Sequence, residues 1–566
     1  MKPSVGRSQI PAGVRRSPLS CPIKPCFRLI SEPQVPFLRS EVHSKVTDRH
    51  GVVARIASLE TDQAADRIPG ISGIQEEHKD SFDWERQWYP LAFVSYLDPK
   101  VPHAKELLGV RLVLWRDAQG TWRCFEDKCP HRLAPLSEGR IEPSDGTLMC
   151  SYHGWRFNGE AKCTDIPQSL DANANAAACN NPRSCAIPRP TKVVQGMIFV
   201  WGKSGPSAVA EAAAKPVLGI PDMEMTEGIP SSTAQGVPTF SFLPAYYREL
   251  PYGWEVLAEN LLDPSHLPFA HHGVLNRRDD EKAGHYRMEV RHSVDAPTGS
   301  GQDVISVAGE SVRPRVGDLQ GRAFQFNPPS LIRWYTYLRE KGDASNHETL
   351  ISMVTFYVIP VAPGKSAVLF SGFFTAMGIK SMPLPALLFL KLRPRWSAHC
   401  FIHMVFDGDS KILYMQERLL AEASRTGKSS WQKKYYMPAQ ADRLVAAFRK
   451  WLDERGGGGP PTRLPQQLPP LEDRQEAFLD RYNQHTRHCP KCLEAVRNFE
   501  RLRIAAVAAG VMCLLALSSA LGRGLAPLSP IPVGIAAGAL VSLAVWIVAG
   551  RFLRKFYFVG YNHSET

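Results

Sequence analysis

Two long apolar runs without charge lie near the end of the chain, at residues 504–521 and 531–550. Each is about as long as the helix of roughly 20 residues that crosses the hydrocarbon core of a bilayer. Arg501 and Arg503 precede the first run, and Arg551, Arg554 and Lys555 follow the second. Both outer ends therefore favour the same side of a membrane. The pattern predicts a transmembrane helical hairpin over residues 501–555, with two buried core helices as the alternative.

The apolar pattern between residues 80 and 205 is typical of short strands. Residues 111–117 and 121–125 are rich in aromatic and β-branched residues and flank a short turn, which predicts a β-hairpin. Residues 196–201 predict a further buried strand. In residues 441–455 apolar positions recur at helical spacing, and the glycines of 456–459 end this amphipathic helix.

These patterns predict an α+β fold in five parts. We expect a presequence at residues 1–59, a β-rich domain at 80–205 and a larger α+β domain at 206–455. A Gly- and Pro-rich linker with a short segment follows at 456–500, before the hairpin at 501–555.

The net charge of +12 comes from 67 Lys and Arg against 55 Asp and Glu. Residues 1–59 carry +7, residues 501–566 carry +5, and residues 60–500 hold 51 basic and 51 acidic residues. A neutral body does not offer the basic surface of a nucleic-acid-binding protein. The first 59 residues are rich in Arg and Ser, poor in acids and without the apolar core of a secretory signal. This composition predicts an organelle transit peptide, with a disordered tail as the alternative.

Two Cys-plus-His pairs predict an iron–sulfur cluster. Cys129-Pro-His131 is followed after eighteen residues by Cys150-Ser-Tyr-His153. In a Rieske [2Fe–2S] cluster two His replace two Cys on one iron and raise the reduction potential. Zinc also binds Cys₂His₂ sets, but neither a Cys-x₂-Cys pair nor a finger helix occurs at these positions. A Rieske cluster is the favoured interpretation.

A second constellation follows about 110 residues later. Asp263, His266 and His271 recur at intervals of three and five residues, and a helix ending near His271 would let them converge. Two His and a distant carboxylate form the facial triad of mononuclear non-heme iron, which leaves positions open for O₂ and substrate. Asp407 and Asp409 are the candidates for the carboxylate. Alone, a His-rich helix end is more often a surface or core feature; the Rieske motif upstream favours iron.

A cysteine pair lies just before the first apolar run. Cys489-Pro-Lys-Cys492 can close a small reducible ring, and its basic neighbours favour exchange with a thioredoxin. An inert exposed pair and a zinc site with His485 and His488 are the alternatives.

Residues 383–390 form an apolar segment that is too short to span a bilayer and has basic neighbours. It is predicted to lie in the headgroup plane, where a membrane-borne substrate would arrive, or else to be an ordinary buried helix.

Over residues 81–560 the sequence resembles the Rieske non-heme iron oxygenases. The resemblance is greatest to the chloroplast branch of pheophorbide a oxygenase, the protochlorophyllide-dependent translocon component and the Tic-type Rieske protein, and among these to pheophorbide a oxygenase. It is carried by residues 88–90, 129–140, 150–155, 163–168, 259–272, 407–409, 416–417, 440–443, 485–486 and 489–492. The Ala-rich residues 171–181 and 208–215 are outside the family pattern and are expected to be surface loops.

The resemblance implies a role for each candidate residue. Cys129, His131, Cys150 and His153 would hold the cluster, and His266, His271 and Asp409 the iron, with Asp409 preferred to Asp407. Asp263 would link the cluster of one subunit to the iron of its neighbour in a ring-like oligomer, usually a homotrimer, and Asn260 would lie near the iron. The implied fold is a β-rich Rieske domain followed by a helix-grip-like catalytic domain.

The implied function is that of a membrane-bound oxygenase in a chloroplast membrane, either inner envelope or thylakoid, with its catalytic domains on the stromal side. Reduced ferredoxin would supply electrons, O₂ would be the oxidant, and a chlorophyll-derived tetrapyrrole the substrate, with ring opening of pheophorbide a to red chlorophyll catabolite expected first. Protochlorophyllide or a phyllobilin are alternative substrates. A redox-sensing subunit of the envelope import machinery and a small-amine mono-oxygenase are further alternatives; a pure sensor needs no facial triad.

Overall fold

The computed structural model describes residues 82–563, except 221–222, 227–228, 234–238, 276, 280–285, 294–303, 312–318, 340–347, 381, 426–430, 462–467 and 473. The transit peptide predicted at residues 1–59 lies outside the described residues.

The first part of the described chain is built from three small antiparallel sheets. One joins β1 (Trp88–Phe93), β11 (Met197–Trp201) and β10 (Thr191–Val194); the second joins β2 (His103–Leu107), β3 (Val110–Arg116), β4 (Trp122–Glu126) and β9 (Pro188–Arg189). The third joins β5 (Arg140–Ile141), β6 (Leu148–Met149), β7 (Arg156–Phe157) and β8 (Cys163–Asp165). The hairpin predicted at 111–125 is confirmed as β3–β4, and the strand predicted at 196–201 is confirmed as β11.

The two Ala-rich segments are helices and not the expected loops. They form α1 (Ala172–Cys179) and α2 (Ala208–Ala214). The loop prediction overlooked the helix propensity of alanine. It also overlooked the N-cap of α1, where the side chain of Asp171 accepts the backbone N–H of Ala174.

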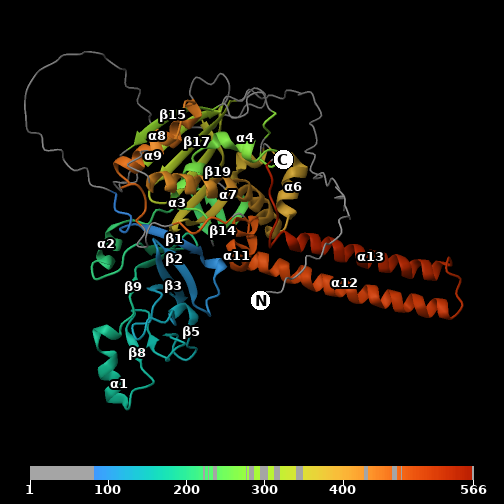
Figure 1. Cartoon of the computed structure of the whole chain (residues 1–566), viewed down its shortest axis with the longest axis horizontal. Helices are drawn as coiled ribbons and strands as arrows, with labels where there is room; N and C mark the ends of the chain where they lie inside the picture. The colour runs from blue at the N-terminus through green and yellow to red at the C-terminus, as the bar shows by residue number, and fades with distance from the viewer. Residues whose placement is uncertain are drawn as a thin grey trace, which may run out of the picture. The chain divides into compact units, whose positions relative to one another are not determined.

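The second part of the chain contains a seven-stranded antiparallel sheet in the order β14-β20-β19-β18-β17-β16-β15. Its strands are β14 (Thr239–Leu250), β15 (Tyr286–Ser293), β16 (Val304–Ser311), β17 (Leu319–Asn327), β18 (Leu331–Arg339), β19 (Glu348–Ala362) and β20 (Lys365–Thr375), and β12 (Met223–Thr226) pairs with β13 (Ile229–Thr233) beside it. The helices before the hairpin are α3 (Trp254–Leu261), α4 (Leu267–Ala270), α5 (Ala376–Lys380), α6 (Leu384–Leu392), α7 (Arg395–Arg425), α8 (Trp431–Lys434), α9 (Arg443–Glu454), α10 (Gln475–Phe478) and α11 (Arg481–Gln484). Figure 1 shows α3, α7 and α9 along this sheet.

Both faces of the large sheet are buried, because successive side chains of a strand point to opposite faces. Tyr246 and Phe356 pack on one face with apolar residues of α3, α7 and α9. Their neighbours Tyr247 and Tyr357 pack on the other face with β1 and β11. The amphipathic helix predicted at 441–455 is confirmed as α9, which begins after a short 3-10 turn and lies in the first cluster.

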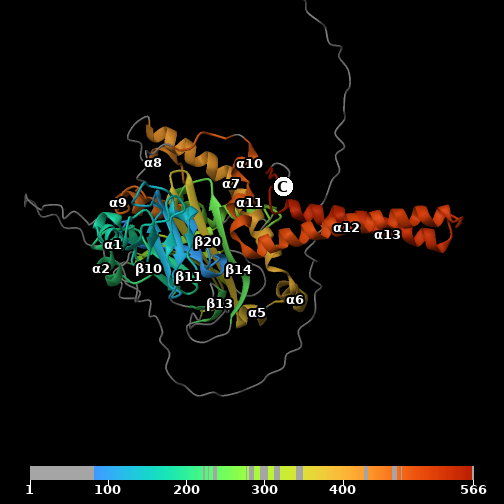
Figure 2. The same ribbon diagram turned by 90° about the horizontal axis from the view of Figure 1, so that it is seen from below.

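Two helices follow the linker and form an antiparallel hairpin (Figures 1 and 2). They are α12 (Pro490–Gly522) and α13 (Pro530–Arg554), and both are long and apolar enough to cross a membrane. Only 11% and 6% of their most apolar windows are buried, so they are not core helices. The alternative of two buried helices is therefore wrong.

The chain returns from α13 to the segment that precedes α12. Phe558 forms a β-bridge with Asp480, the backbone N–H of Arg481 donates to the carbonyl of Tyr557, and the hydroxyl of Thr486 donates to the carbonyl of Phe556. The segment after α13 is thus hydrogen-bonded to the segment before α12, which closes the base of the hairpin.

Candidate metal centres

The four predicted cluster ligands lie on two loops that extend from the small sheets. The first loop follows β4 and is closed by the backbone N–H of Cys129, which donates to the carbonyl of Ala134 at 2.8 Å. The second follows β6 and is closed by the N–H of Cys150, which donates to the carbonyl of Trp155 at 2.9 Å. Both cysteines are buried.

The two histidines approach each other on the outer side of these loops. The rings of His131 and His153 are 4.6 Å apart, and His131 stacks on the indole of Trp155 at 4.7 Å. His131 is exposed and His153 is partly exposed. Two buried thiols and two imidazoles on adjacent loops match the donor set of a Rieske [2Fe–2S] cluster, which these four residues would hold.

The second group forms where the chain turns after α3. Asp263 caps the 3-10 turn Pro264–His266, which continues as α4 and ends at His271. The single helix predicted here is therefore a 3-10 turn followed by the short helix α4, and Asp263 lies just before the turn. Asp409 reaches this group from the middle of α7. Its Oδ1 lies 3.7 Å from His266 Nε2 and 3.3 Å from His271 Nε2.

His266, His271 and Asp409 have the features of a metal site. Their potential ligand atoms all lie within 4.8 Å of one another. His271 is fully buried; its Nε2 faces Asp409, and its Nδ1 has no hydrogen-bond partner among the described residues. A buried imidazole nitrogen without a partner costs free energy unless something else binds it. Two imidazoles and one carboxylate on one side of a site match the donor set of non-heme Fe(II).

The neighbours of these three residues hold them in place. Nδ1 of His266 bonds to the backbone carbonyl of Asp263, which leaves Nε2 toward Asp409. The side chain of Asn260 bonds to Asp409. Burial acts to raise the pKa of Asp409, but His271, His266 and Asn260 outweigh it and hold the pKa below its ordinary value. The carboxylate therefore stays ionised, as a metal ligand must.

Asp407 is engaged elsewhere. Its two oxygens pair with Arg248 and Arg481, each at 2.6 Å, in a fully buried network. Gly408 lies between the two acids, and a Cβ there would be 3.0 Å from Nδ1 of His271. The close approach of α7 to the histidine thus depends on glycine at this position.

Comparison with known proteins identifies the family. A model of the Rieske [2Fe–2S] domain matches residues 87–175, and a model of pheophorbide a oxygenase matches residues 326–426, which include Asp409. The chain is 34% identical to the chloroplastic pheophorbide a oxygenase of Oryza sativa subsp. japonica, over 88% of this chain and 89% of that protein. The chain belongs to the Rieske oxygenase family that includes pheophorbide a oxygenase.

Other members of this Rieske oxygenase family have different names. The chain is 32% identical to the chloroplastic flavonoid 8-hydroxylase 2 of Ocimum basilicum, over 87% of this chain and 88% of that protein. It is 29% identical to the chloroplastic protochlorophyllide-dependent translocon component 52 of Arabidopsis thaliana, over 96% of both. As a Rieske oxygenase, the chain is an enzyme that uses a [2Fe–2S] cluster and a mononuclear non-heme iron.

The cysteine pair near the hairpin lies in an unexpected environment. Cys489 and Cys492 are fully buried, so the interpretation as an inert exposed pair is wrong. The histidines beside them are His485 and His399. His488 instead bonds to the carbonyl of Asn483, so the predicted group with His488 is also wrong. His399 was missed because it is 86 residues from His485 in the sequence and no local motif marks it.

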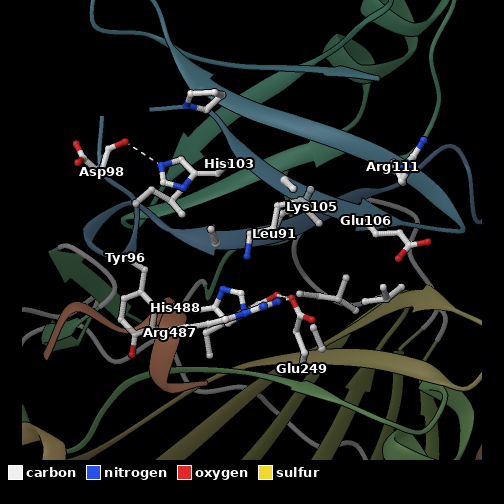
Figure 3. Close-up of a pocket in the computed structure, with 18 of the residues that line it drawn as sticks. Leu91, Tyr96, Asp98, His103, Lys105, Glu106, Arg111, Glu249, Arg487 and His488 are labelled. Carbon is white, nitrogen blue, oxygen red and sulfur yellow. Dashed lines mark hydrogen bonds and ion pairs between the residues drawn. The ribbon is translucent and has the colours of Figure 1, made fainter. Parts of the chain in front are cut away.

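A cavity of about 690 Å³ lies beside this pair, between β2, β14 and the start of α12 (Figure 3). Lys105, Glu249 and His488 face it, and Glu249 also pairs with Lys365 at 3.2 Å. Burial acts to raise the pKa of Glu249, but the two lysines dominate and lower it to about 2. None of the candidate ligands of either iron centre lines this cavity, so it is separate from both candidate centres.

Proposed function

We propose that the chain is a membrane-bound oxygenase of a chlorophyll-derived tetrapyrrole, which opens the macrocycle of pheophorbide a to red chlorophyll catabolite. The observation that carries the proposal is the match to the pheophorbide a oxygenase model over residues 326–426, the segment that supplies Asp409 to the group of His266 and His271.

Each residue of the iron site has a structural task in this proposal. His266, His271 and Asp409 would hold the mononuclear iron, and Asn260 would hold the carboxylate of Asp409 in position. Cys129, His131, Cys150 and His153 would hold the [2Fe–2S] cluster. When bound, the two groups supply electron transfer and O₂ activation.

Electron delivery is proposed to cross between subunits. Among the described residues, no hydrogen bond or ion pair joins the two cluster loops to Asp263, His266 or His271 of the same chain. Figure 1 also draws β5 and β8 far from α4. The side chain of Asp263 is 27% exposed and lies beside His266, so it is available to a cluster-bearing loop of a second copy. A homotrimer supplied by reduced ferredoxin is the proposed arrangement.

The membrane would be a chloroplast membrane, with the catalytic part on its stromal side. Support comes from α12 and α13 and from α6, the helix over the apolar segment predicted at 383–390. The alternative of a buried helix is wrong, because no residue of α6 is buried and Leu384, Leu388, Phe389 and Leu392 are exposed. Trp396, just after α6, packs on Phe499 and Phe552 at the base of the hairpin. This position suits a helix that lies in the headgroup layer.

A second candidate function is hydroxylation of another planar substrate. It is favoured by the 32% identity to a flavonoid 8-hydroxylase, whose name describes hydroxylation and not ring opening. The same iron-site residues would serve both reactions, so the shape of the substrate pocket would decide between them. Protochlorophyllide, or a phyllobilin, stays as a further substrate candidate.

The test is an oxygenation assay with the full chain in lipid nanodiscs. Reduced ferredoxin and ¹⁸O₂ are supplied with pheophorbide a, protochlorophyllide or a flavone in parallel reactions, and mass spectrometry follows labelled products. We expect labelled ring-opened product from pheophorbide a, and none from His266→Ala.

Labelled flavone or protochlorophyllide without ring opening would replace the first candidate by a hydroxylase. Turnover that survives His266→Ala would refute the assignment of the iron site. Protein with both iron centres and no turnover of any substrate would favour a role in import.

A further inference from the structure

A third group of metal-binding side chains lies at the base of the membrane hairpin. It consists of His399 on α7, His485 after α11, and Cys489 and Cys492 at the start of α12. These four residues, the junction cluster, are all buried, with exposures of 2%, 0%, 0% and 0%. They belong to neither iron centre.

The distances within the junction cluster fit a tetrahedral ion. His399 Nδ1 lies 3.2 Å from His485 Nε2, 3.3 Å from the sulfur of Cys492 and 3.5 Å from that of Cys489. His485 Nε2 is 3.3 Å from the sulfur of Cys492. A zinc ion with bonds of about 2.3 Å to sulfur and about 2.0–2.1 Å to nitrogen puts neighbouring ligand atoms about 3.3–3.8 Å apart.

The hydrogen bonds around the histidines leave their lone pairs for a metal. Nδ1 of His485 donates to the backbone carbonyl of Tyr247, which fixes the tautomer and leaves Nε2 as an acceptor. Nε2 of His399 has no hydrogen-bond partner among the described residues. The polar contacts of His399 are therefore with the other three members of the junction cluster.

The surroundings of the junction cluster disfavour an exchange reaction with a protein partner. Apolar residues, including Cys400, Ala495, Val496 and Phe556, enclose the two sulfurs. Thiol–disulfide exchange requires access to a sulfur atom, and neither sulfur is accessible in this arrangement. A closed Cys₂His₂ set in an apolar shell is instead typical of structural zinc.

We propose that the junction cluster binds a structural zinc ion that fixes the membrane hairpin to the iron-bearing helix α7. His399 and Asp409 lie on the same helix, Cys489 is the N-cap residue of α12, and Cys492 lies in its first turn. One ion thus joins the base of the anchor to the helix that supplies the carboxylate of the iron site. The inference does not depend on the substrate.

The experiment measures metals in the full chain, purified in detergent without chelators. Mass spectrometry of the metals is expected to find about one zinc per chain in addition to iron. Cys489→Ser with Cys492→Ser, and separately His399→Ala, should lower zinc at least about tenfold. The visible spectrum of the [2Fe–2S] cluster should persist in both, which shows that the chain still folds.

Two variants are matched controls. Cys400→Ala removes a buried cysteine of the same apolar cluster, and His488→Ala removes the histidine next to Cys489. Both should keep zinc. X-ray absorption at the zinc edge of the unmodified chain should show two sulfur and two nitrogen neighbours, which tests the proposal even if the ligand variants fail to fold.

Several results would overturn the proposal. They are unmodified protein without stoichiometric zinc, zinc without sulfur neighbours, a Cys489–Cys492 disulfide in the isolated protein, and retention of zinc in both ligand variants. A fourth iron in place of zinc would also reject the assignment of the metal.

Discussion

At the residue scale, two acids separated by one glycine have different tasks. Asp409 faces His266 and His271, whereas Asp407 is enclosed by Arg248 and Arg481. The side chains diverge because neighbouring positions on a helix differ by about 100° per residue, so two residues apart face nearly opposite sides. Identical side chains thus take part in a candidate metal site and in a buried ion-pair network.

Substitution of the two acids should separate these tasks. Asp409→Asn is expected to lower the content of mononuclear iron and the oxygenation rate by more than about 100-fold, while the chain still folds. This loss exceeds the roughly 10–100-fold that is typical when a residue next to a metal ligand is changed. Asp407→Asn should instead destabilise the chain by about 3–5 kcal/mol, because it leaves two buried arginines without a full partner. Iron content, oxygenation rate and thermal unfolding check both. Iron loss in Asp407→Asn at unchanged stability would contradict the assignment.

A partly buried acid on α7, Glu417, gives the stability a pH dependence. Burial raises the pKa of Glu417 to about 7, although its carboxylate accepts the backbone N–H of Gly253 at 2.9 Å. The ordinary pKa is about 4.3, so between these values the folded chain binds more protons than the unfolded chain. Its stability therefore falls as pH rises through this window.

Glu417→Gln keeps an acceptor for Gly253 and removes the ionisation. We expect the variant to be more stable than the unmodified chain at pH 8 by about 1–3 kcal/mol, with the difference vanishing toward pH 4.5. Thermal unfolding at several pH values in detergent measures this. A difference that is equal at both ends of the range would show that Glu417 is already charged in the folded chain.

At the element scale, α6 is the helix whose exposure the sequence did not settle. Its apolar side chains are exposed, and Lys391 within it is exposed as well. A water-exposed apolar helix is unfavourable unless another apolar phase covers it. A headgroup layer next to α12 and α13 would supply such a phase.

The prediction for α6 is contact with lipid. A photo-reactive phenylalanine analogue at position 389, in full chain reconstituted into nanodiscs, should cross-link to lipid. The same analogue at position 170, where Leu170 is 98% exposed in the β-rich part of the chain, should not. Equal lipid labelling at both positions, or none at 389, would argue against a membrane contact of α6.

At the scale of the whole molecule, residues after α13 contact the segment that carries the candidate iron ligands. After α13 the chain passes beside residues 478–486 and reaches α4, where the hydroxyl of Tyr561 donates to the carbonyl of Ala270 at 3.0 Å. Ala270 immediately precedes His271. The two ends of the hairpin are also adjacent, because the rings of Phe499 and Phe552 stack at 5.5 Å.

This arrangement predicts that a short linker can replace the hairpin of α12 and α13. The residues that follow α13, here called the tail, should instead be required for iron binding and stability. A chain in which a Gly/Ser linker of about four residues replaces residues 501–551 should fold without detergent and keep its iron. A chain that ends at residue 500 should lose iron and stability, because the tail contacts are absent. Solubility, metal content and thermal unfolding compare the two. Equal iron in both chains would mean that the tail does not support the site.

The sequence alone determined the features that depend on local order. Cys129, His131, Cys150 and His153 follow a spacing that short loops impose, and β3–β4 and α9 follow from apolar periodicity. The match to a Rieske domain model and the apolar length of α12 and α13 agree with those patterns.

Only the tertiary structure decided which distant residues meet. Asp409 was preferred to Asp407 by resemblance, but the two arginines around Asp407 come from β14 and α11, which no local pattern connects. His399 has no sequence signal at all, and its packing against His485, Cys489 and Cys492 depends on how α7 crosses the base of the hairpin. Periodicity reports which face of an element is buried; it does not report which other element covers that face.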